Sequence, residues 1–360
     1  MSQRLLVLSR YSRLGASSRL RTLQYDPWLQ DAGFEVEYAP FFDDAYLHGI
    51  YGVGGRNANV LRYYRHRLTR LLRGPRPSLI WVEKEALPWV PWMAENLLLS
   101  HSVPVVSDHD DAVFHRYDRH RLALVRRLLG RKIDRVMRCS ALVTAGNPYL
   151  AARAHAAGAK NVQVVPTVVD LAHYQGVGTF DSDTPLRIGW IGSPHTWAEY
   201  MSPMMPSLTS IAASVGARIT AVGAGNVTPQ DAVLDVLPWT EDTEVERIRA
   251  MDIGIMPLTD TPWSRGKCGY KLIQYMACGL PVVASPVGVN THIVEHGVNG
   301  FLAASDAEWR DALYKLARDP GLRQKMGTAG RLKVETDYSL AAWGPRVAAM
   351  LSHVVGGARP

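Results

Sequence analysis

The chain has 360 residues, of which 47% are hydrophobic and 20% are charged, and this composition is typical of a globular protein and excludes a mainly disordered one. The three cysteines, Cys139, Cys268 and Cys278, have neither C-x-x-C spacing nor nearby histidines, so we expect free thiols, not a disulfide framework or a zinc site. The longest apolar runs fall short of the roughly 18 residues of a membrane-spanning helix, and the apolar run at residues 5–8 is too short for a secretory signal, so we expect a cytoplasmic protein.

The net charge of +7 is concentrated in the first half of the chain. Residues 1–176 hold 24 Lys and Arg against 15 Asp and Glu, whereas residues 177–360 hold 16 against 18. A basic half attracts anionic partners such as phosphates, anionic lipid or nucleic acid, and peripheral contact with a membrane is one expectation. The alternative is that the excess of Arg over Lys, 32 to 8, reflects only the codon bias of a GC-rich genome. Nucleic-acid binding would depend on charge alone, because the chain has no zinc-finger spacing and no aromatic RNA-binding pattern, and we do not expect it.

Short aliphatic and β-branched runs recur along the first half, with helical stretches between them. These runs are residues 4–9, 34–38, 79–82, 104–107, 141–144 and 162–165. Such alternation predicts βαβ units around a parallel sheet.

A basic amphipathic helix is predicted over residues 59–73. Its apolar face would consist of Leu61, Tyr64, Leu68, Leu71 and Leu72, with arginines around the rest of the helix. Those arginines either form a solvated face or bind an anionic membrane or acceptor.

Residues 175–185 are rich in Gly, Asp, Ser and Pro and predict a linker. The alternation then resumes with runs at residues 186–192, 218–223, 252–256 and 281–284. We therefore predict an α/β protein with two tandem Rossmann-like domains, residues 1–176 and 177–339, each with a parallel sheet. A last helical stretch within residues 340–360 is expected to pack back on the first domain.

Polar clusters follow two of the predicted strands in the first domain, where open α/β sheets bind ligands. Gly15, Ala16, Ser17 and Arg19 come after the first strand and form either a site for close backbone approach or a flexible turn with a serine helix cap. Three adjacent charges, at residues 83–85, follow the third strand and form either a functional site or a solvated charge run.

The fourth strand ends in Asp108, His109, Asp110 and Asp111. Carboxylates and histidine are suitable metal ligands. Consecutive side chains at a strand end point to alternate sides, however. We therefore expect one or two of these residues to face the ligand edge and the others to cap the following helix.

The densest signal lies in residues 265–284. Gly266 and Gly269 predict a turn with free backbone N–H groups, followed by a helix over residues 270–278. A diphosphate at such a helix start meets unpaired N–H donors and the positive end of the helix dipole.

Lys267 and Lys271 would add positive charge at this turn. Gln274 is three residues after Lys271, so the two share a helix face. This spacing suits a nucleoside diphosphate, with Gln274 near the ribose; the alternative is an exposed helix face.

Residues 271–283 read K-L-I-Q-Y-M-A-C-G-L-P-V-V, which resembles the K-x-x-E-Y-M-A-x-G-x-P-V-V signature of family 4 glycosyltransferases. The similarity extends over most of residues 186–340, and more loosely to Gly15, His109 and Asp110. It implies the GT-B fold, in which two Rossmann-like domains face a central cleft. It also implies a retaining, metal-independent enzyme without a cofactor, which moves a sugar from a nucleoside-diphosphate sugar to a hydroxyl or other nucleophile of a small-molecule, glycan or lipid-linked acceptor.

With this resemblance, site residues are expected in both domains. We expect donor binding by Gly192, Ser193, Thr196, Trp239, Lys267, Cys268, Gly269, Tyr270, Lys271 and Gln274. We expect acceptor binding by Gly15, Ala16, Ser17, Arg19, Glu83, Lys84 and Glu85. The catalytic residues would be Lys271, which stabilises charge on the leaving diphosphate, and His109 and Asp110, which orient the sugar or the acceptor.

Two departures from the family pattern are evident. The family usually has two glutamates eight positions apart, where this chain has Gly266 and Gln274. The family also often has Arg and Lys after the first strand of the second domain, where this chain has Ser193 and uncharged neighbours, so Lys267 and Lys271 are expected to supply that charge. A sugar-nucleotide 2-epimerase, a catalytically silent nucleotide-sugar-binding protein and a basic adaptor are the alternatives.

Overall fold

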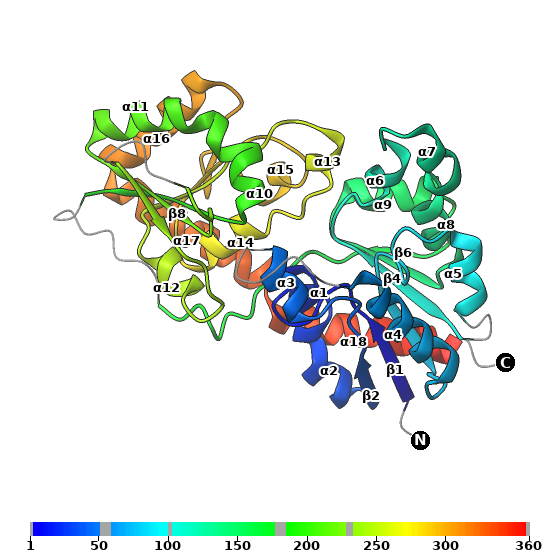
Figure 1. Cartoon of the computed structure of the whole chain (residues 1–360). Coiled ribbons are helices and arrows are strands. Elements are labelled where there is room, and N and C mark those ends of the chain that lie inside the picture. The colour runs from blue at the N-terminus through cyan, green and yellow to red at the C-terminus, as the bar shows by residue number, and fades with distance from the viewer. Residues whose placement is uncertain (1–2, 51–58, 100–102, 177–184, 228–232, 358–360) are drawn as a thin grey trace. The chain divides into compact units, whose positions relative to one another are not determined.

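In the computed structural model, the described residues are 3–50, 59–99, 103–176, 185–227 and 233–357, and they group into two compact units (Figure 1). The first unit comprises residues 1–167, 265–268 and 343–360, and the second comprises residues 168–264 and 269–342. Most of the predicted linker, residues 177–184, lies outside the described residues, so the domain boundary between residues 176 and 177 stays a prediction.

The first unit is built on a parallel sheet of six strands in the order β2-β1-β3-β4-β5-β6. Each strand lies on one of the six predicted runs: β1 (Gln3–Leu8), β2 (Phe34–Tyr38), β3 (Leu79–Glu83), β4 (Val105–His109), β5 (Leu142–Ala145) and β6 (Val162–Val164). The central strands read as continuous apolar runs because helices pack against both faces of the sheet and leave Leu5 to Leu8 buried.

Short helices and one 3-10 turn connect these strands. They are α1 (Ala16–Arg21), η1 (Leu23–Tyr25), α2 (Asp26–Asp31), α3 (Asp44–Ile50), α4 (Val60–Arg73), α5 (Trp92–Leu98), α6 (Phe114–Asp118), α7 (Ala123–Leu129), α8 (Lys132–Cys139) and α9 (Pro148–Ala156). The last helix of the chain, α18 (Leu340–Gly357), begins at the predicted residue, and its Gly344 lies so close to the ring of Trp28 that a side chain there would clash.

The predicted basic helix is α4, but its faces differ from the prediction. Leu61 and Leu72, expected on the packed face, are exposed. Arg67, expected among the solvated arginines, is buried, and its guanidinium donates to the backbone carbonyls of Ser9, Ala39 and Ala86. A buried guanidinium is tolerated here because carbonyls at the ends of neighbouring strands satisfy its N–H groups.

The second unit has its own parallel sheet of six strands in the order β12-β11-β10-β7-β8-β9. Its strands are β7 (Arg187–Ile191), β8 (Arg218–Val222), β9 (Leu234–Leu237), β10 (Ile253–Met256), β11 (Val282–Ala284) and β12 (Gly300–Leu302). The predicted α/β class with two parallel sheets is confirmed. Strands β9 and β12 are missing from the sequence prediction because they are edge strands of only four and three residues, too short to give a clear pattern.

The helices of the second half cover this sheet and enclose a core that includes Ile188, Trp190, Ile219 and Ile253. They are α10 (Pro194–Thr196), the π-helical η2 (Trp197–Met201), η3 (Ser202–Met204), α11 (Met205–Val215), α12 (Glu244–Arg249), α13 (Pro262–Arg265), α14 (Tyr270–Ala277), α15 (Asn290–Ile293), α16 (Asp306–Arg318) and α17 (Pro320–Asp337). Within the described ranges, no helix is both long and apolar enough to cross a membrane. All three cysteines are free thiols, as expected.

Candidate functional site

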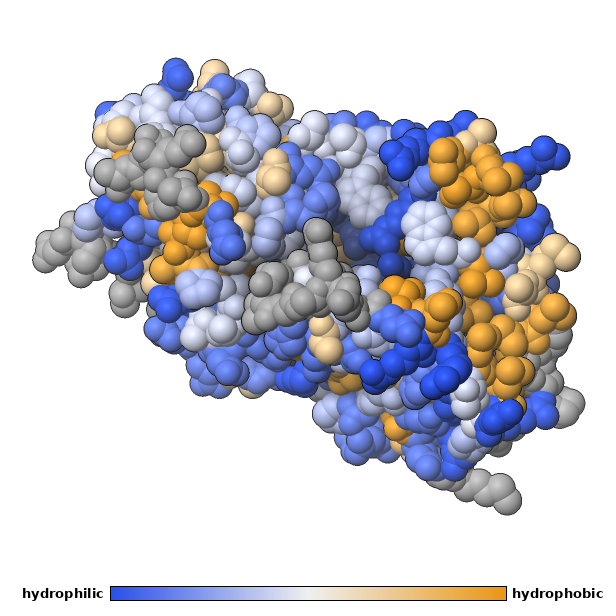
Figure 2. Space-filling model, in the orientation of Figure 1, coloured by the Kyte–Doolittle hydropathy of each residue, from blue (hydrophilic) through white to orange (hydrophobic). Residues whose placement is uncertain are grey.

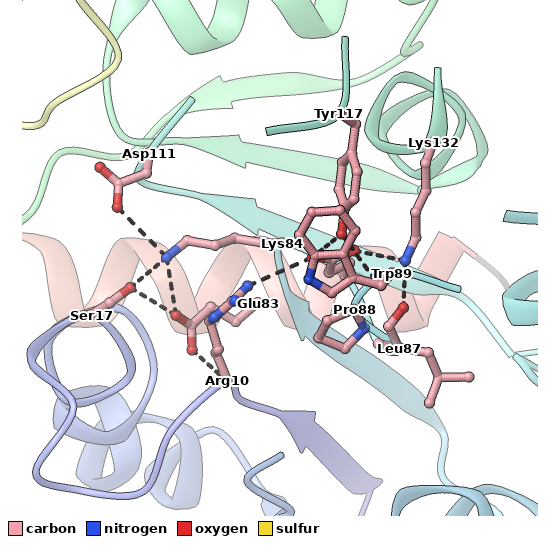
Figure 3. Close-up of polar contacts among 12 residues, drawn as sticks. Arg10, Ser17, Glu83, Lys84, Leu87, Pro88, Trp89, Asp111, Tyr117 and Lys132 are labelled. Carbon is pink, nitrogen blue, oxygen red and sulfur yellow. Dashed lines mark hydrogen bonds and ion pairs between the residues drawn. The ribbon is translucent and has the colours of Figure 1, made fainter. Parts of the chain in front are cut away.

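A buried polar cluster lies at the carboxyl ends of β1, β3 and β4 in the first unit (Figure 3). Glu83, the last residue of β3, accepts hydrogen bonds from the Arg10 backbone N–H (2.8 Å) and from the hydroxyls of Ser17 (2.7 Å) and Ser18 (2.5 Å). Because β1 and β3 are neighbours, the loop after β1 meets the end of β3. The structure thus brings together Ser17 and Glu83, two of the predicted acceptor residues.

Lys84 is the cation of this cluster. Its Nζ lies 2.7 Å from Asp110 Oδ1, 3.4 Å from Glu83 Oε1 and 2.9 Å from the Ser17 hydroxyl. Burial acts to lower its pKa, but the carboxylates of Asp110, Glu83 and Asp111 outweigh burial and hold the pKa above its ordinary value. The ammonium therefore stays charged.

The backbone of Lys84 is strained, with a φ of 66° in the left-handed region that favours glycine. Strained non-glycine residues cluster at functional sites, where the surrounding structure over-determines them. The interpretation of residues 83–85 as a solvated charge run is wrong, since Glu83, Lys84 and Glu85 are all buried.

Glu85 belongs to a second, adjoining cluster, which includes Tyr117 and Lys132 (Figure 3). It accepts hydrogen bonds from the Tyr117 hydroxyl (2.8 Å) and from Lys132 Nζ (2.6 Å), and Arg10 lies 3.6 Å away. Lys132 also pairs with Glu95 at 2.9 Å, and burial raises the pKa of Glu95. The sequence prediction missed Arg10, Tyr117, Lys132 and Glu95 because they come from separate elements and share no spacing with Glu85.

The residues at the end of β4 do not all face one way: Asp108 and His109 are buried within the unit, whereas Asp110 and Asp111 both lie near Lys84. Asp108 forms a buried bidentate pair with Arg21 (2.9 and 2.6 Å) and faces the interior of the unit. Asp110 turns to Lys84, and its Oδ2 lies 2.5 Å from the Ser17 hydroxyl. The expected capping of the next helix is wrong, because Val113 is the N-cap of α6 and no side chain caps that helix.

The pKa values of Asp110 and Asp111 are shifted in opposite directions. Burial acts to raise the pKa of Asp110, but Lys84 outweighs burial and lowers it, so this carboxylate stays ionised. Burial and the neighbouring Asp110 charge raise the pKa of Asp111. Among the residues that the structure describes, no three His, Cys, Asp or Glu side chains are grouped so that they could hold a metal ion.

His109 is fully buried and neutral. Burial and the nearby Lys84 ammonium lower its pKa to about 3. Its Nε2 lies 3.2 Å from the Ser107 hydroxyl, and its buried Nδ1 has no hydrogen-bond partner within the described part of the chain. A neutral imidazole with one open nitrogen can donate to or accept from a hydroxyl, depending on its tautomer.

Gly15, Ala16 and Arg19, the other residues predicted after β1, lie outside the Lys84 cluster. Gly15 is the N-cap of α1, which corrects the serine-cap interpretation, and a side chain there would clash with the Tyr11 ring. Ala16 is exposed, whereas Arg19 is buried and donates from Nη1 to the Arg13 carbonyl (3.3 Å). The structure therefore does not bring Ala16 or Arg19 into the Lys84 cluster.

Lys267 and Cys268, which the sequence prediction places in the second domain, pack in the first unit. The Lys267 carbonyl accepts from the Asn147 side chain (2.9 Å), and the Cys268 thiol donates to the Asp110 carbonyl (3.0 Å). Burial raises the pKa of the Cys268 thiol, so it stays protonated. Asn147 is a further residue that the sequence prediction missed.

In the second unit, the end of β7 and the start of α14 meet at Lys271. Its Nζ lies 4.4 Å from the centroid of the Trp190 ring, within the range of a cation–π interaction. A Cβ at Gly192 would lie 2.7 Å from that Nζ and 2.5 Å from the Trp190 ring, so a side chain there would displace the ammonium or the ring. Gly269 is the N-cap of α14 with a φ of 67°, as the predicted turn requires.

Gln274 lies one turn further along α14 and is buried. Its Nε2 donates to the Tyr174 hydroxyl at 3.1 Å, so the alternative of an exposed helix face is wrong for this residue. Tyr174, a missed partner, has its pKa raised by burial. Tyr270, the first residue of α14, is half-buried.

The other predicted donor residues have partners within the second unit. Ser193 and Thr196 form a capping box at α10, with the Ser193 N–H donating to the Thr196 hydroxyl at 3.0 Å. The Trp239 indole N–H donates to Glu244 at 2.9 Å. These hydroxyls and this indole are therefore engaged in local structure.

Comparison with known proteins points to one family for part of the chain. Residues 185–319 match the family model described as Glycosyl transferases group 1. D-inositol 3-phosphate glycosyltransferase of Pseudarthrobacter chlorophenolicus is 32% identical over 107 residues, which are 29% of this chain and 24% of the relative. The match thus spans about a quarter of that relative's length.

Two solved structures resemble the whole chain in fold. Sucrose-phosphate synthase from Thermosynechococcus elongatus has a TM-score of 0.71 at 14% identity and covers 99% of this chain and 100% of its own. HepE of Anabaena, solved in complex with UDP and glucose, has a TM-score of 0.67 at 16% identity and covers 98% of this chain and 100% of its own. The likeness confirms the predicted architecture of two Rossmann-like parallel-sheet domains, a fold shared with these proteins.

Proposed function

We propose that this protein is a family 4 glycosyltransferase that moves a sugar from a nucleoside-diphosphate sugar to an acceptor nucleophile, with retention and without a metal. The observation that carries the proposal is the Lys271 ammonium beside Gly192, at the start of a helix capped by left-handed Gly269. The match of residues 185–319 to the group 1 model supports it, as does the fold shared with a protein solved with UDP and glucose.

The donor diphosphate would bind at this helix start. The start of a helix and its dipole favour an anion, and Lys271 adds a full positive charge. When the glycosidic bond breaks, charge builds on the diphosphate, and a preorganised cation stabilises it more in the transition state than in the ground state. Within the second unit, we assign further donor contacts to Gly192, Ser193, Thr196, Trp239, Gly269, Tyr270 and Gln274.

Gln274 would hydrogen-bond to the ribose as a neutral side chain, at the position where the family has a charged glutamate. Its Nε2 already donates to the Tyr174 hydroxyl, which fixes the orientation of the amide. An amide oriented in this way presents its oxygen as an acceptor for a ribose hydroxyl. The family's other glutamate position, Gly266, offers no side chain at all.

The acceptor would bind in the first unit, at the Lys84 cluster and the adjoining Glu85 cluster, through Ser17, Glu83, Lys84 and Glu85. Asp110 stays ionised beside Lys84, and neutral His109 offers its Nδ1 to a sugar or acceptor hydroxyl. In a retaining transfer the departing phosphate oxygen takes the acceptor's proton on the same face. The side chains of His109 and Asp110 then orient hydroxyls and need not remove the proton.

The decisive experiment is a thermal-shift panel of UDP, GDP, ADP, CMP, dTDP and their common sugar conjugates. Binding to the native state stabilises it by RT ln(1 + [L]/Kd), about 2.7 kcal/mol at a hundredfold excess over Kd. We expect one nucleotide to raise the melting temperature of the native protein and of Lys325→Ala, an exposed lysine on α17, but not of Lys271→Ala. No shift with any nucleotide at millimolar concentration would contradict the proposal.

A catalytically silent nucleotide-sugar-binding protein is the second candidate, favoured by the loss of both glutamates at Gly266 and Gln274. It would show the same thermal shift. It would release no nucleoside diphosphate from the donor, with or without acceptors, in an assay of donor turnover. Release of the nucleoside diphosphate that Lys271→Ala abolishes would exclude it.

A further inference from the structure

Six large apolar side chains stand exposed on the first unit. They are between 48% and 79% exposed, and we call their surface the α5–α7 face: Trp89, Met93, Leu97, Leu122, Leu124 and Leu128. Figure 2 shows apolar side chains gathered over the part of the molecule where α5 and α7 lie. The proposed transfer reaction uses none of these residues.

The apolar side chains are aligned along their helices. Met93 and Leu97 are four residues apart on α5, and Leu124 and Leu128 are four residues apart on α7, so each pair lies on one side of its helix. Trp89 connects the two pairs, because it precedes α5 and its ring contacts His120, which precedes α7 (5.7 Å between centroids).

Trp89 is held in place by the buried polar cluster. Its backbone N–H donates to the Tyr117 hydroxyl (3.0 Å), and its indole packs edge-on against the Tyr117 ring (5.1 Å). Its φ of 61° is a left-handed conformation that a bulky residue rarely adopts. The fold thus fixes a half-exposed tryptophan at a strained position, which a residue without a role at the surface would not require.

The charge around the α5–α7 face has one sign. Residues 116–131 contain six arginines and one acidic residue, Asp118, which is paired with Arg153 at 3.1 Å. Arg119, Arg121, Arg127 and Arg131 are exposed along this segment, next to the leucines of α7. A partner that covers the leucines therefore also meets a row of guanidinium groups.

We propose that the α5–α7 face docks on a bilayer that contains anionic phospholipids. Leucine and methionine side chains on a helix surface insert into the boundary between headgroups and acyl chains, and tryptophan favours that depth. Arginines beside them attract anionic headgroups, with each contributing about 1 kcal/mol near a charged membrane. The sequence-based expectation of membrane contact concerned residues 59–73, whereas this proposal places the contact at α5 and α7. This inference goes beyond the proposed reaction and does not depend on it.

The test is flotation of the full chain with vesicles of phosphatidylcholine alone and with 30% phosphatidylglycerol. We expect at least tenfold more bound protein on the anionic vesicles at 0.1 M salt and a steep loss of binding at 0.5 M salt. Replacing two leucines, in Leu124→Ser/Leu128→Ser, should reduce binding at least tenfold. Replacing three arginines, in Arg121→Gln/Arg127→Gln/Arg131→Gln, should reduce it by about fivefold per arginine.

Matched controls come from the second unit, where Leu332 and Lys325 are exposed on α17. Leu332→Ser and Lys325→Gln should bind vesicles like the native protein, and all variants should keep its melting temperature because the replaced side chains are exposed. Absence of binding to both vesicle types would overturn the proposal. Binding that survives both the leucine and the arginine substitutions would overturn the assignment to this face, as would binding lost equally in Leu332→Ser.

Discussion

The Lys84 ammonium lies 2.7 Å from the Asp110 carboxylate, and each residue follows directly on the end of one of two neighbouring strands, β3 and β4. The buried ammonium of Lys84 thus pairs with carboxylates at the ends of two strands, Glu83 and Asp110. The same ammonium also lies close enough to His109 to help to keep that imidazole neutral. Lys84 therefore helps to keep Asp110 ionised and His109 neutral.

Replacing Lys84 should lower the free energy of unfolding. Lys84→Met leaves Glu83 and Asp110 as buried carboxylates without their cation, and breaking a buried pair in this way costs about 3–5 kcal/mol. We expect a loss of that size in the free energy of unfolding, measured by denaturant titration at pH 7. Lys160→Met, at an exposed lysine of the same unit, should change it by less than about 0.5 kcal/mol. Equal stability of the two variants would show that the cluster is not held by Lys84.

His109 should make the protein less stable in acid. Its pKa is lowered from 6.5 to about 3 in the folded state, so the unfolded chain binds the proton more tightly. Stability from this group is complete above the unfolded pKa and is lost as the pH falls from 6.5 toward 3, by about 1.4 kcal/mol per pH unit.

Denaturant titrations at several pH values between 4 and 7 measure this slope. His109→Asn should reduce the slope by the contribution of about one proton, which is about 1.4 kcal/mol per pH unit. His155→Asn, at an exposed histidine of α9, should leave the slope unchanged. An unaltered slope in His109→Asn would mean that the imidazole is protonated in the folded protein.

Lys271 should carry much of the donor's binding energy in the transition state. Lys271→Ala is expected to raise the donor KM or to reduce kcat by at least tenfold, because a cation beside the leaving diphosphate is lost. Steady-state kinetics with the nucleotide sugar found in the thermal-shift panel measure both constants. Kinetics identical to those of Lys325→Ala would refute the role assigned to Lys271.

Gly192 should be needed for the position of that lysine. A methyl group at Gly192 would lie 2.7 Å from Lys271 Nζ and 2.5 Å from the Trp190 ring, so Gly192→Ala is expected to displace the ammonium. The thermal shift with the donor nucleotide should then fall while the unliganded protein stays folded. Gly356→Ala, at a glycine with open space around it, should retain the full shift. A full shift in Gly192→Ala would indicate that the ammonium can bind the diphosphate from another position.

Local patterns in the sequence determined the secondary structure and the general type of the molecule. Aliphatic runs predict ten of the twelve strands, and the turn at Gly269 predicts the start of α14. These features are readable because parallel strands buried on both faces need continuous apolar runs, and because a left-handed helix cap favours glycine. The polar residues after the strands were also found, since ligand edges follow from topology.

Only the tertiary structure decided which of these polar residues are buried and with what partners. Residues 83–85 have the composition of a solvated run, yet Lys84 and Glu85 are buried. Asp110 and Lys132, from other elements, pair with their charges, and the Tyr117 hydroxyl donates to Glu85. In the same way, contacts with Asn147 and with the Asp110 carbonyl group the Lys267 loop with the first unit. The periodicity of apolar residues indicates which side of a segment faces the core. Ion pairing depends on which distant segments come into contact, and the local sequence carries no signal for those contacts.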